Sequence, residues 1–292
     1  MDMTGITFQN YTDGDYEAVC DFLIERNRQD RNHIHWNWAR FEWMMEHPAF
    51  HRDQIGAIGL WKDQEKVVGA AIYDMYFGEG FCGALPEYEE LYPAILTYAC
   101  RELRDWEGFG LAVCDNCASE IEAVCRAGLV PTDGSETMLR LTLDGGLTAS
   151  LPEGLTFAEL NPAIEAYDFQ WLLWQGFDHG TDRAAFESAE PIVPQIRRHF
   201  NPRLSVAAVN SAGEKAGYCC VWYHPATDYA YVEPVCVIPS YRGQGVTKAV
   251  VSEALNRAAA LGAKTAYVLS DMMFYQKLGF QMDRRFSFYW KK

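Results

Sequence analysis

The sequence predicts an α+β (mixed α/β) fold in which one kind of domain occurs twice. The chain has 292 residues, about twice the roughly 150 residues of an average domain. Short segments also recur at offsets of 149, 153 and 151 residues, as expected for an internal repeat. The matched segments are Gly5-Ile6-Thr7-Phe8 with Gly154-Leu155-Thr156-Phe157, Leu85-Pro86-Glu87-Tyr88 with Ile238-Pro239-Ser240-Tyr241, and Ala127-Gly128-Leu129 with Leu278-Gly279-Phe280. The predicted domains are 1–147 and 153–292, joined by a turn-rich linker.

The second copy is expected to consist of strands, then a strand–loop–helix–strand unit, then a final strand, which indicates a mixed sheet. Apolar and β-branched runs predict strands over 155–160, 203–210, 215–223, 229–238, 264–270 and 280–290. Asn161-Pro162 predicts a helix start, because Asn caps helices and Pro fits their first turn. Further helices are expected over 247–261, ended by Gly262, and over 272–278.

Charge is distributed unevenly along the chain and narrows the class of partner. The net charge is −15, from 25 basic and 40 acidic residues, and all of it lies in residues 1–150. Nucleic acid is therefore not an expected partner, because binding to phosphates depends on Lys and Arg. A cationic small molecule fits better, since a negative field concentrates cations. The alternative is that the acidity only keeps the protein soluble.

The remaining composition predicts a cytoplasmic protein with no membrane partner. No apolar run approaches the roughly 18 residues of a membrane span, and the first residues lack the pattern of a signal peptide. Nine scattered cysteines fit a reducing compartment. Cys114-Asp115-Asn116-Cys117 has the spacing of half a zinc site, but buried thiols are the expected reading, and no metal is predicted. His33 and His35 are also too few for a metal site.

The segment 235–247 carries the strongest functional signal. An apolar strand end passes through glycines into the predicted helix over 247–261. Backbone N–H groups at a helix N-terminus are unpaired and the helix dipole adds positive charge, so such a place binds phosphate. Glycine lets the backbone approach the anion closely. The spacing is neither that of a P-loop nor that of the dinucleotide-binding G-x-G-x-x-G motif.

This segment resembles the coenzyme A pyrophosphate loop of the GNAT acyltransferase superfamily, whose pattern is Q/R-x-x-G-x-G/A. Here it reads Arg242-Gly243-Gln244-Gly245-Val246-Thr247, and 274–280, Phe-Tyr-Gln-Lys-Leu-Gly-Phe, is similar to the closing motif of the family. The sequence departs from the pattern at Thr247, where Gly or Ala is usual, and at Ser270-Asp271, where Asn is frequent. The resemblance covers about residues 155–290. It implies two GNAT-like domains, each a mostly antiparallel twisted sheet flanked by helices.

The resemblance also implies the chemistry and the residues that perform it. An amine would attack the thioester of acetyl-CoA directly, with no metal, and backbone groups near the end of the fourth strand would bind the coenzyme. Tyr275 matches the proton donor to the leaving thiolate, and Glu233 is the expected base for the amine; the alternatives are a core tyrosine and a solvated strand residue. The predicted coenzyme-binding residues are Val235, Cys236, Val237, Arg242, Gly243, Gln244, Gly245, Val246, Thr247, Ser270 and Tyr275. The alternative for Arg242 is a surface ion pair.

The acceptor is expected to be a small, cationic primary amine bound near 169–182. Trp174, Asp178 and Asp182 are the predicted binding residues, because aromatic faces and carboxylates suit a cation. His179, His199 and His224 rank below Glu233 as the base. Two alternatives stay open: a non-catalytic acyl-CoA-binding sensor or scaffold, and a peptide or protein N-acetyltransferase. The sequence gives no oligomeric state.

The first copy is predicted to have lost its coenzyme site. Alignment on Pro86 and Pro239 places Glu89, Glu90 and Tyr92 where Arg242, Gly243 and Gly245 stand. Carboxylates and a bulky ring would repel a pyrophosphate. Alignment on the later glycines places Val124 where Tyr275 stands. The first copy therefore reads as a degenerate GNAT-like domain.

Overall fold

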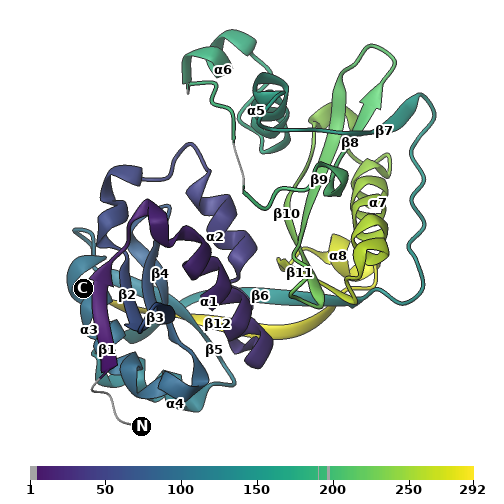
Figure 1. Ribbon diagram of the computed structural model, residues 1–292. Helices are drawn as coiled ribbons and strands as arrows, with labels where there is room; N and C mark the ends of the chain where they lie inside the picture. Colours follow the sequence, from purple (N-terminus) through teal and green to yellow (C-terminus); the bar gives the residue numbers. More distant parts are fainter. Residues whose placement is uncertain (1–4, 190, 196–197) are drawn as a thin grey trace. The chain divides into compact units, whose positions relative to one another are not determined.

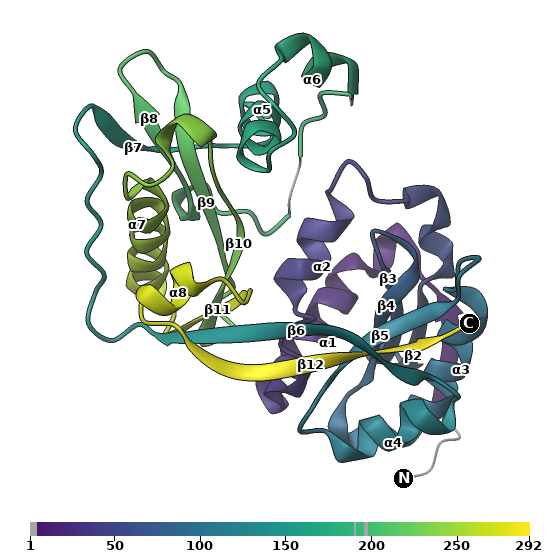
Figure 2. The same cartoon turned by 180° about the vertical axis from the view of Figure 1, so that it is seen from behind.

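The computed structural model describes residues 5–189, 191–195 and 198–292, and its contacts divide the chain into two units. The first unit comprises Met1–Met138, Leu269–Asp271 and Met282–Lys292, and the second comprises Leu139–Val268 and Met272–Gln281. Both are mixed sheets with helices packed against them (Figure 1; Figure 2 shows the reverse side). Within the described residues, no helix is long and apolar enough to cross a membrane.

The first unit is a mostly antiparallel sheet with strand order β1-β2-β3-β4-β5-β12-β6. Its strands are β1 (Ile6–Asn10), β2 (Gly59–Asp63), β3 (Lys66–Asp74), β4 (Tyr76–Ala84), β5 (Phe109–Cys114), β12 (Gln281–Lys291) and the larger part of β6 (Val130–Thr142). Its helices are α1 (Tyr16–Gln29), α2 (Trp38–Met45), α3 (Tyr92–Glu102) and α4 (Ala118–Arg126). A buried pair, Lys62 with Asp15 at 2.7 Å, ties β2 to the turn before α1.

The second unit repeats this arrangement. Its sheet has the order β11-β10-β9-β8-β7, with the end of β6 beside β11. Its strands are β7 (Leu155–Glu159), β8 (Ser205–Asn210), β9 (Lys215–Tyr223), β10 (Tyr229–Val237) and β11 (Thr265–Leu269). Its helices are α5 (Ala166–Gly176), α6 (Arg183–Ala189), α7 (Val246–Leu261) and α8 (Met273–Lys277). Helix α7 covers one face of the sheet, where it shares a core with the alternate residues of β8, β9 and β10.

Helix α5 packs on the opposite face of the same sheet. The ring of Phe169 on α5 meets the edge of Tyr218 on β9 at 5.3 Å between centroids. Further along, Gly176 lies so close to β10 that a Cβ placed there would be 2.5 Å from the Cβ of Cys236. Alternate residues of a strand point to opposite faces, so Cys236 faces α5 while its neighbour Val237 faces the core under α7.

The predicted fold class is confirmed, and most second-copy elements lie within a residue or two of their predicted bounds. Helix α5 differs, because Asn161 accepts the N–H of Ala163 in a separate turn and the helix begins only at Ala166. The start of the predicted strand over 203–210 is a short 3-10 turn, Pro202–Leu204. The predicted division also follows the chain order, whereas the contacts place the last strand, Met282–Lys292, in the first unit.

Candidate active site

Strand β10 separates from β11 part of the way along its length. The two strands pair in parallel only from Tyr229 to Tyr231, opposite Thr265 to Tyr267. On its other side β10 stays paired with β9, with a bulge at Glu233 and Pro234 between the aligned residues Val232 and Val235. The bulge bends β10, as bulges do. The last part of β10 therefore presents an edge that faces away from β9.

The backbone of Val235 and Val237 forms this edge. Ile238 donates its N–H to the carbonyl of Ala216 on β9, so Cys236, two residues earlier, belongs to the same hydrogen-bonded series. The N–H and C=O groups of Val235 and Val237 then point away from β9. An extended ligand that contains amides can pair with such an edge as an added strand would.

The loop after β10 ends in a helix N-terminus that is open to an anion. Gly243 and Gly245 have φ values of +74° and +86°, and Gly245 is the N-cap of α7. No atom lies within 4 Å of the position where either would carry a Cβ. The first N–H groups of a helix have no partner within it, and the first turn of α7 holds no acidic residue. This loop therefore has the backbone donors and the space that a pyrophosphate requires.

The side chains of Gln244, Val246 and Thr247 in this loop are bonded or packed within the protein. The Gln244 amide donates to the carbonyl of Ser240 at 2.9 Å. Val246 is buried under the sheet, and Thr247 is half-buried in the first turn of α7. The loop therefore offers mainly backbone groups to a ligand, which is the reason that its two left-handed glycines matter.

Arg242 holds three segments together. Its Nε donates to the carbonyl of Val237 at 3.0 Å and its Nη2 donates to the carbonyl of Gly176 at 2.8 Å. Its Nη1 bonds both carboxylate oxygens of Asp178, at 2.9 and 3.1 Å. The sequence places Arg242 at the coenzyme and Asp178 at the acceptor, and the structure brings them into direct contact. Gly176 was not anticipated, although a glycine at the end of a predicted helix is a signal for close packing or a cap.

Tyr275 lies on α8 with its ring buried and 6% of the residue exposed. The ring meets Phe274 and Phe280 edge-on, at 5.0 and 5.5 Å between centroids. Burial, together with nearby Cys219 and Glu233, raises the pKa of the Tyr275 hydroxyl well above its usual value. Within the described residues, no hydrogen bond to this hydroxyl is present, and it is not among the fully enclosed polar atoms. The hydroxyl is therefore protonated, and it donates its proton to no other described residue.

Glu233 and Cys236 lie on β10 and face different surroundings. Glu233 is half-buried at the bulge, and its carbonyl accepts the indole N–H of Trp222 at 2.7 Å. Its charge contributes to the raised pKa of Tyr275, so the two predicted catalytic groups share one region. Cys236 faces α5, and burial raises the pKa of its thiol to about 12. The backbone of Cys236 is paired with β9 and its thiol faces α5, so neither is directed to the open edge of β10.

Ser270 follows β11 directly and its backbone is already engaged. Its N–H donates to the carbonyl of Thr137 at 2.8 Å, and the contacts place it in the first unit. The predicted coenzyme contact of Ser270 would have to use its side chain, because the N–H has a partner.

The predicted acceptor residues differ in how far their side chains are already engaged by other parts of the protein. Asp182 caps α6 by accepting the N–H of Ala184 at 2.9 Å. Trp174 packs against His179 at 5.0 Å between ring centroids, and its indole N–H is enclosed with no partner among the described residues. Arg183 lies over the rings of Trp171 and Tyr167, at 5.0 and 5.7 Å from their centroids. Two aromatic faces near Trp174 therefore already hold a cation from the chain itself.

The corresponding loop of the first unit cannot hold an anion in the same way. A 3-10 turn, Pro86–Leu91, runs directly into α3 with no left-handed glycine between them. The N–H of Tyr92, at the start of α3, is bonded to the carbonyl of Glu89, and the next residue, Pro93, has no N–H. Val124 is fully buried on α4, at the position aligned with Tyr275.

The space between β4 and β5 of the first unit is also filled. Trp36 stacks on Phe81 of β4 at 5.5 Å, and His33 meets the same ring edge-on at 5.7 Å. His35, which is buried, donates from Nε2 to the carbonyl of Ala112 on β5 at 3.2 Å. This segment occupies backbone that a coenzyme would need, so it supports a first copy without a coenzyme site.

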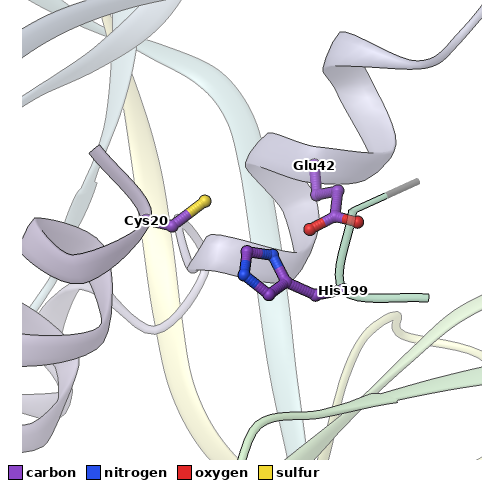
Figure 3. A group of neighbouring side chains, drawn as sticks. All are labelled: Cys20, Glu42 and His199. Carbon is purple, nitrogen blue, oxygen red and sulfur yellow. The ribbon is translucent and has the colours of Figure 1, made fainter. Parts of the chain in front are cut away.

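Two other polar side chains of the first unit, Cys20 on α1 and Glu42 on α2, are drawn in Figure 3 together with His199 of the second unit. Both Cys20 and Glu42 are buried. Structural zinc takes four protein ligands, so this pair alone does not make a metal site. Burial raises the pKa of the adjacent Tyr16, and the charge of Glu42 adds to the effect.

The sequence and the fold both resemble known proteins. Residues 166–280 match the model of the acetyltransferase (GNAT) family. A tandem GNAT protein from the clavulanic acid biosynthesis pathway has 16% sequence identity, a TM-score of 0.64 and 98% coverage of each chain. A GCN5-related N-acetyltransferase from Sphaerobacter thermophilus has 14% identity, a TM-score of 0.59, and coverage of 98% of this chain and 95% of its own.

A third similar structure is the N-myristoyltransferase of Saccharomyces cerevisiae, solved with bound myristoyl-CoA. It has 13% identity and a TM-score of 0.56, and the match covers 98% of this chain and 78% of that chain. No curated protein sequence matches the chain. The two-copy arrangement predicted from the repeats is thus found in solved structures, and the matched family segment contains β10, the glycine loop and Tyr275.

Proposed function

Taking the chain as a tandem GNAT-type acetyltransferase with its family domain in residues 166–280, we propose that the second unit transfers an acetyl group from acetyl-CoA to a small, cationic primary amine. One observation carries the proposal. A helix N-terminus opened by two left-handed glycines follows a strand that is not paired with β11 beyond Tyr231, and a protonated tyrosine lies close to Glu233 of that strand.

The residues fit the parts of the co-substrate. The first turn of α7 and the backbone of the glycine loop bind the pyrophosphate, because unpaired N–H groups and the helix dipole favour an anion there. The N–H and C=O groups of Val235 and the N–H of Val237 pair with the amides of the pantetheine arm, while the Val237 carbonyl stays bonded to Arg242. One of these N–H groups stabilises the charge that develops on the thioester oxygen.

The chemical step then needs two proton transfers. The amine nitrogen attacks the thioester carbon, the new C–N bond forms, and the C–S bond breaks. The departing thiolate takes the proton of Tyr275, whose raised pKa keeps it protonated until that moment. Glu233 accepts the proton that the amine loses, directly or through water. No metal is involved in this scheme.

The acceptor site is the least constrained part of the proposal. Trp174 and the carboxylates of Glu233, Asp178 and Asp182 give the region aromatic and acidic character that suits a cation. Asp182 contributes only its charge, because its side chain caps α6. The acidity of residues 1–150 adds a negative field that concentrates cations near the protein.

Calorimetric titration with acetyl-CoA and with CoA tests the coenzyme site. We expect one binding site per chain. Gly245→Glu should abolish binding, because the new carboxylate and the strained backbone would occupy the place of the phosphates at the N-terminus of α7. Gly213→Glu is the matched control, since Gly213 has φ +83° and equally open surroundings in the hairpin between β8 and β9. Two sites per chain would assign a coenzyme site to the first unit, and the absence of binding at micromolar concentration would overturn the proposal.

Turnover separates an enzyme from a non-catalytic sensor. A screen of amine acceptors, with release of free CoA thiol as the readout, is expected to find activity that Tyr275→Phe loses while CoA binding persists. Coenzyme binding without turnover of any amine or peptide would favour the sensor. Turnover of peptides alone would favour a protein N-acetyltransferase.

A further inference from the structure

The turn that follows α5 combines two local features that are each unfavourable. His179 donates its N–H to the carbonyl of Trp174 and Asp178 donates to the carbonyl of Gln175, which is the bonding pattern of a Schellman motif. Asp178 holds the left-handed position of this motif, with φ +64°, where glycine is the usual residue. Its carboxylate also lies at the negative end of the α5 dipole.

The chain contains a compensating group, Arg242, in the coenzyme loop. The guanidinium reaches Asp178 with two hydrogen bonds and Gly176 with a third, so it closes the turn from outside α5. The pair is largely exposed, with 42% of the Arg242 side chain and 67% of the Asp178 side chain accessible. Exposed ion pairs contribute little to global stability. The stability of the fold therefore does not explain why an aspartate stands at this position.

The segment 176–182 touches both predicted ligand sites. The segment begins at Gly176, which packs against Cys236 of β10. It contains Asp178 and Asp182, two of the predicted acceptor-binding residues. Arg242 lies in the loop that precedes α7, and its Nε donates to the carbonyl of Val237, the last residue of β10. The guanidinium thus links the end of the coenzyme-binding strand to the segment that faces the acceptor.

We propose that Asp178 is a positioning residue that, through Arg242, couples coenzyme binding in the glycine loop to the order of segment 176–182. This inference rests on the proposed function, because it assigns the loop to the coenzyme. When the pyrophosphate orders the loop, Arg242 is fixed and Asp178 and the Gly176 carbonyl are fixed with it. The acceptor segment is then completed only once the coenzyme is in place. Energetic coupling between two ligand sites of this kind amounts to about five- to 150-fold in affinity.

Hydrogen–deuterium exchange with CoA as the probe tests this coupling without knowledge of the acceptor. In the wild-type chain, saturating CoA is expected to slow exchange of the amides in 176–182 at least about fivefold. Asp178→Asn, which tolerates the left-handed conformation, and Asp178→Gly, which prefers it, are expected to bind CoA and to lose this protection. Asp144→Asn is the control, because it removes an exposed aspartate charge that lies outside both predicted ligand sites.

The outcomes separate this inference from the proposed function. If CoA does not bind the wild-type chain, the proposed function fails first. If CoA binds but leaves the exchange of 176–182 unchanged, or accelerates it because the phosphates take Arg242 from Asp178, the inference is overturned while the proposed function stands. Protection that survives in both Asp178 variants overturns it as well.

Thermal unfolding distinguishes positioning from a purely structural role. Asp178→Gly relieves the left-handed strain and the unfavourable dipole contact, so its melting temperature is expected to equal or exceed that of the wild type. A clear fall in melting temperature for Asp178→Gly would mean that the ion pair holds the fold, and the positioning role would be rejected.

Discussion

Tyr275 is the residue whose environment most directly matches a catalytic task. A tyrosine of ordinary pKa, about 10, would begin to lose its proton at the alkaline pH where amines become reactive. Burial raises the pKa of Tyr275 beyond that range, so the hydroxyl remains a proton donor. Its ring is fixed by Phe274 and Phe280, which keeps the hydroxyl in place. Position and protonation state are thus set by the same packing.

The pH dependence of turnover follows from the direction of that shift. We expect kcat/KM to rise as the acceptor amine deprotonates and to show no decline up to pH 10, since Tyr275 stays protonated. Tyr275→Phe is expected to lower kcat about 100-fold or more, the usual contribution of a general acid. Tyr223→Phe, which removes a hydroxyl from β9 elsewhere in the same sheet, should leave both parameters near wild-type values. A falling limb between pH 9 and 10 in the wild type would contradict this role.

Some features of the candidate site could be predicted from the sequence and others could not, for physical reasons. Tyr275 and Gly245 were predictable because each belongs to a short motif read along the chain. The pairing of Asp178 with Arg242 was not, because it joins residues 64 positions apart through a bend in β10 that no local pattern reveals. Arg242 and Asp178 were assigned to different ligands, whereas in the structure they first bind each other.

At the scale of elements, the glycine loop and α7 form the unit to which we assign coenzyme binding. The helix begins at Val246 and ends at Gly262, whose φ is +118°, close to the predicted range because glycine marks both ends. The start of α5 was predicted too early, since Asn161 caps a turn that does not continue into the helix. Local capping chemistry is the same in both cases, and tertiary contacts decide whether a helix follows.

The effect of Gly245 on CoA binding can be measured separately from the strain of its left-handed conformation. Gly245→Ala and Gly213→Ala each place a Cβ in a left-handed conformation with open surroundings, and each should cost about 1 kcal/mol of unfolding free energy. Only Gly245→Ala is expected to weaken CoA binding, by about tenfold or more, because its methyl group lies where the phosphates approach. Equal CoA affinity for the two variants, measured by calorimetry alongside urea unfolding, would show that the loop is not the cradle.

The Lys62–Asp15 pair is the clearest stability element of the first unit. The Asp15 carboxylate also accepts from Gln9 and from both the N–H and the hydroxyl of Thr12. Although burial opposes ionisation, the bonds to Lys62 and Thr12 prevail and hold the pKa of Asp15 below its usual value. This pair therefore adds stability at neutral pH, and that part is lost only as the pH falls below about 4, through the folded-state pKa.

Removing the lysine should expose the cost of the buried carboxylate. Lys62→Met is expected to lower the unfolding free energy of this unit by about 3–5 kcal/mol at pH 7, the cost of breaking a buried pair. Arg28→Met is the control, since it removes an exposed partner of Glu25 on α1 and should cost about 1 kcal/mol or less. The deficit of Lys62→Met relative to wild type should shrink as the pH falls through the lowered folded-state pKa of Asp15, because the carboxylate that Lys62 pairs with then becomes neutral. Urea unfolding at pH 7 and pH 3 measures both effects.

At the scale of the whole molecule, the repeat predicted the two-copy fold but not the ownership of the last strand. The repeated segments indicate where each copy begins and ends along the chain, and they do not indicate which sheet the last strand joins. The structure pairs β12 with β5, from Phe286 opposite Cys114 to Lys291 opposite Phe109. Phe286 is fully buried, and Trp290 fits over Gly110, where a Cβ would lie 2.2 Å from the indole.

A chain that ends at residue 280 tests this assignment. It is expected to lose protection of the β5 amides against hydrogen exchange, because β5 becomes an edge and the ring of Phe286 is missing from the core. The amides of β8 and β9 should keep their protection. Met282→Ala, which alters an exposed side chain on β12, is the control and should leave both regions unchanged. Retained β5 protection in the shortened chain would refute the dependence of the first unit on β12.

Because β12 is the last strand to be synthesised, it determines when the first unit can complete its sheet. Ribosomes add about 5–20 residues each second, so β5 emerges roughly 10–35 s before the strand that must pair with it. Throughout that interval the nascent first unit carries an open sheet edge, the feature by which strands join foreign chains. A premature stop anywhere in the second copy would release a first copy that is unable to complete its sheet. The two copies can thus be told apart along the sequence, but the first cannot complete its sheet before the last strand of the chain is made.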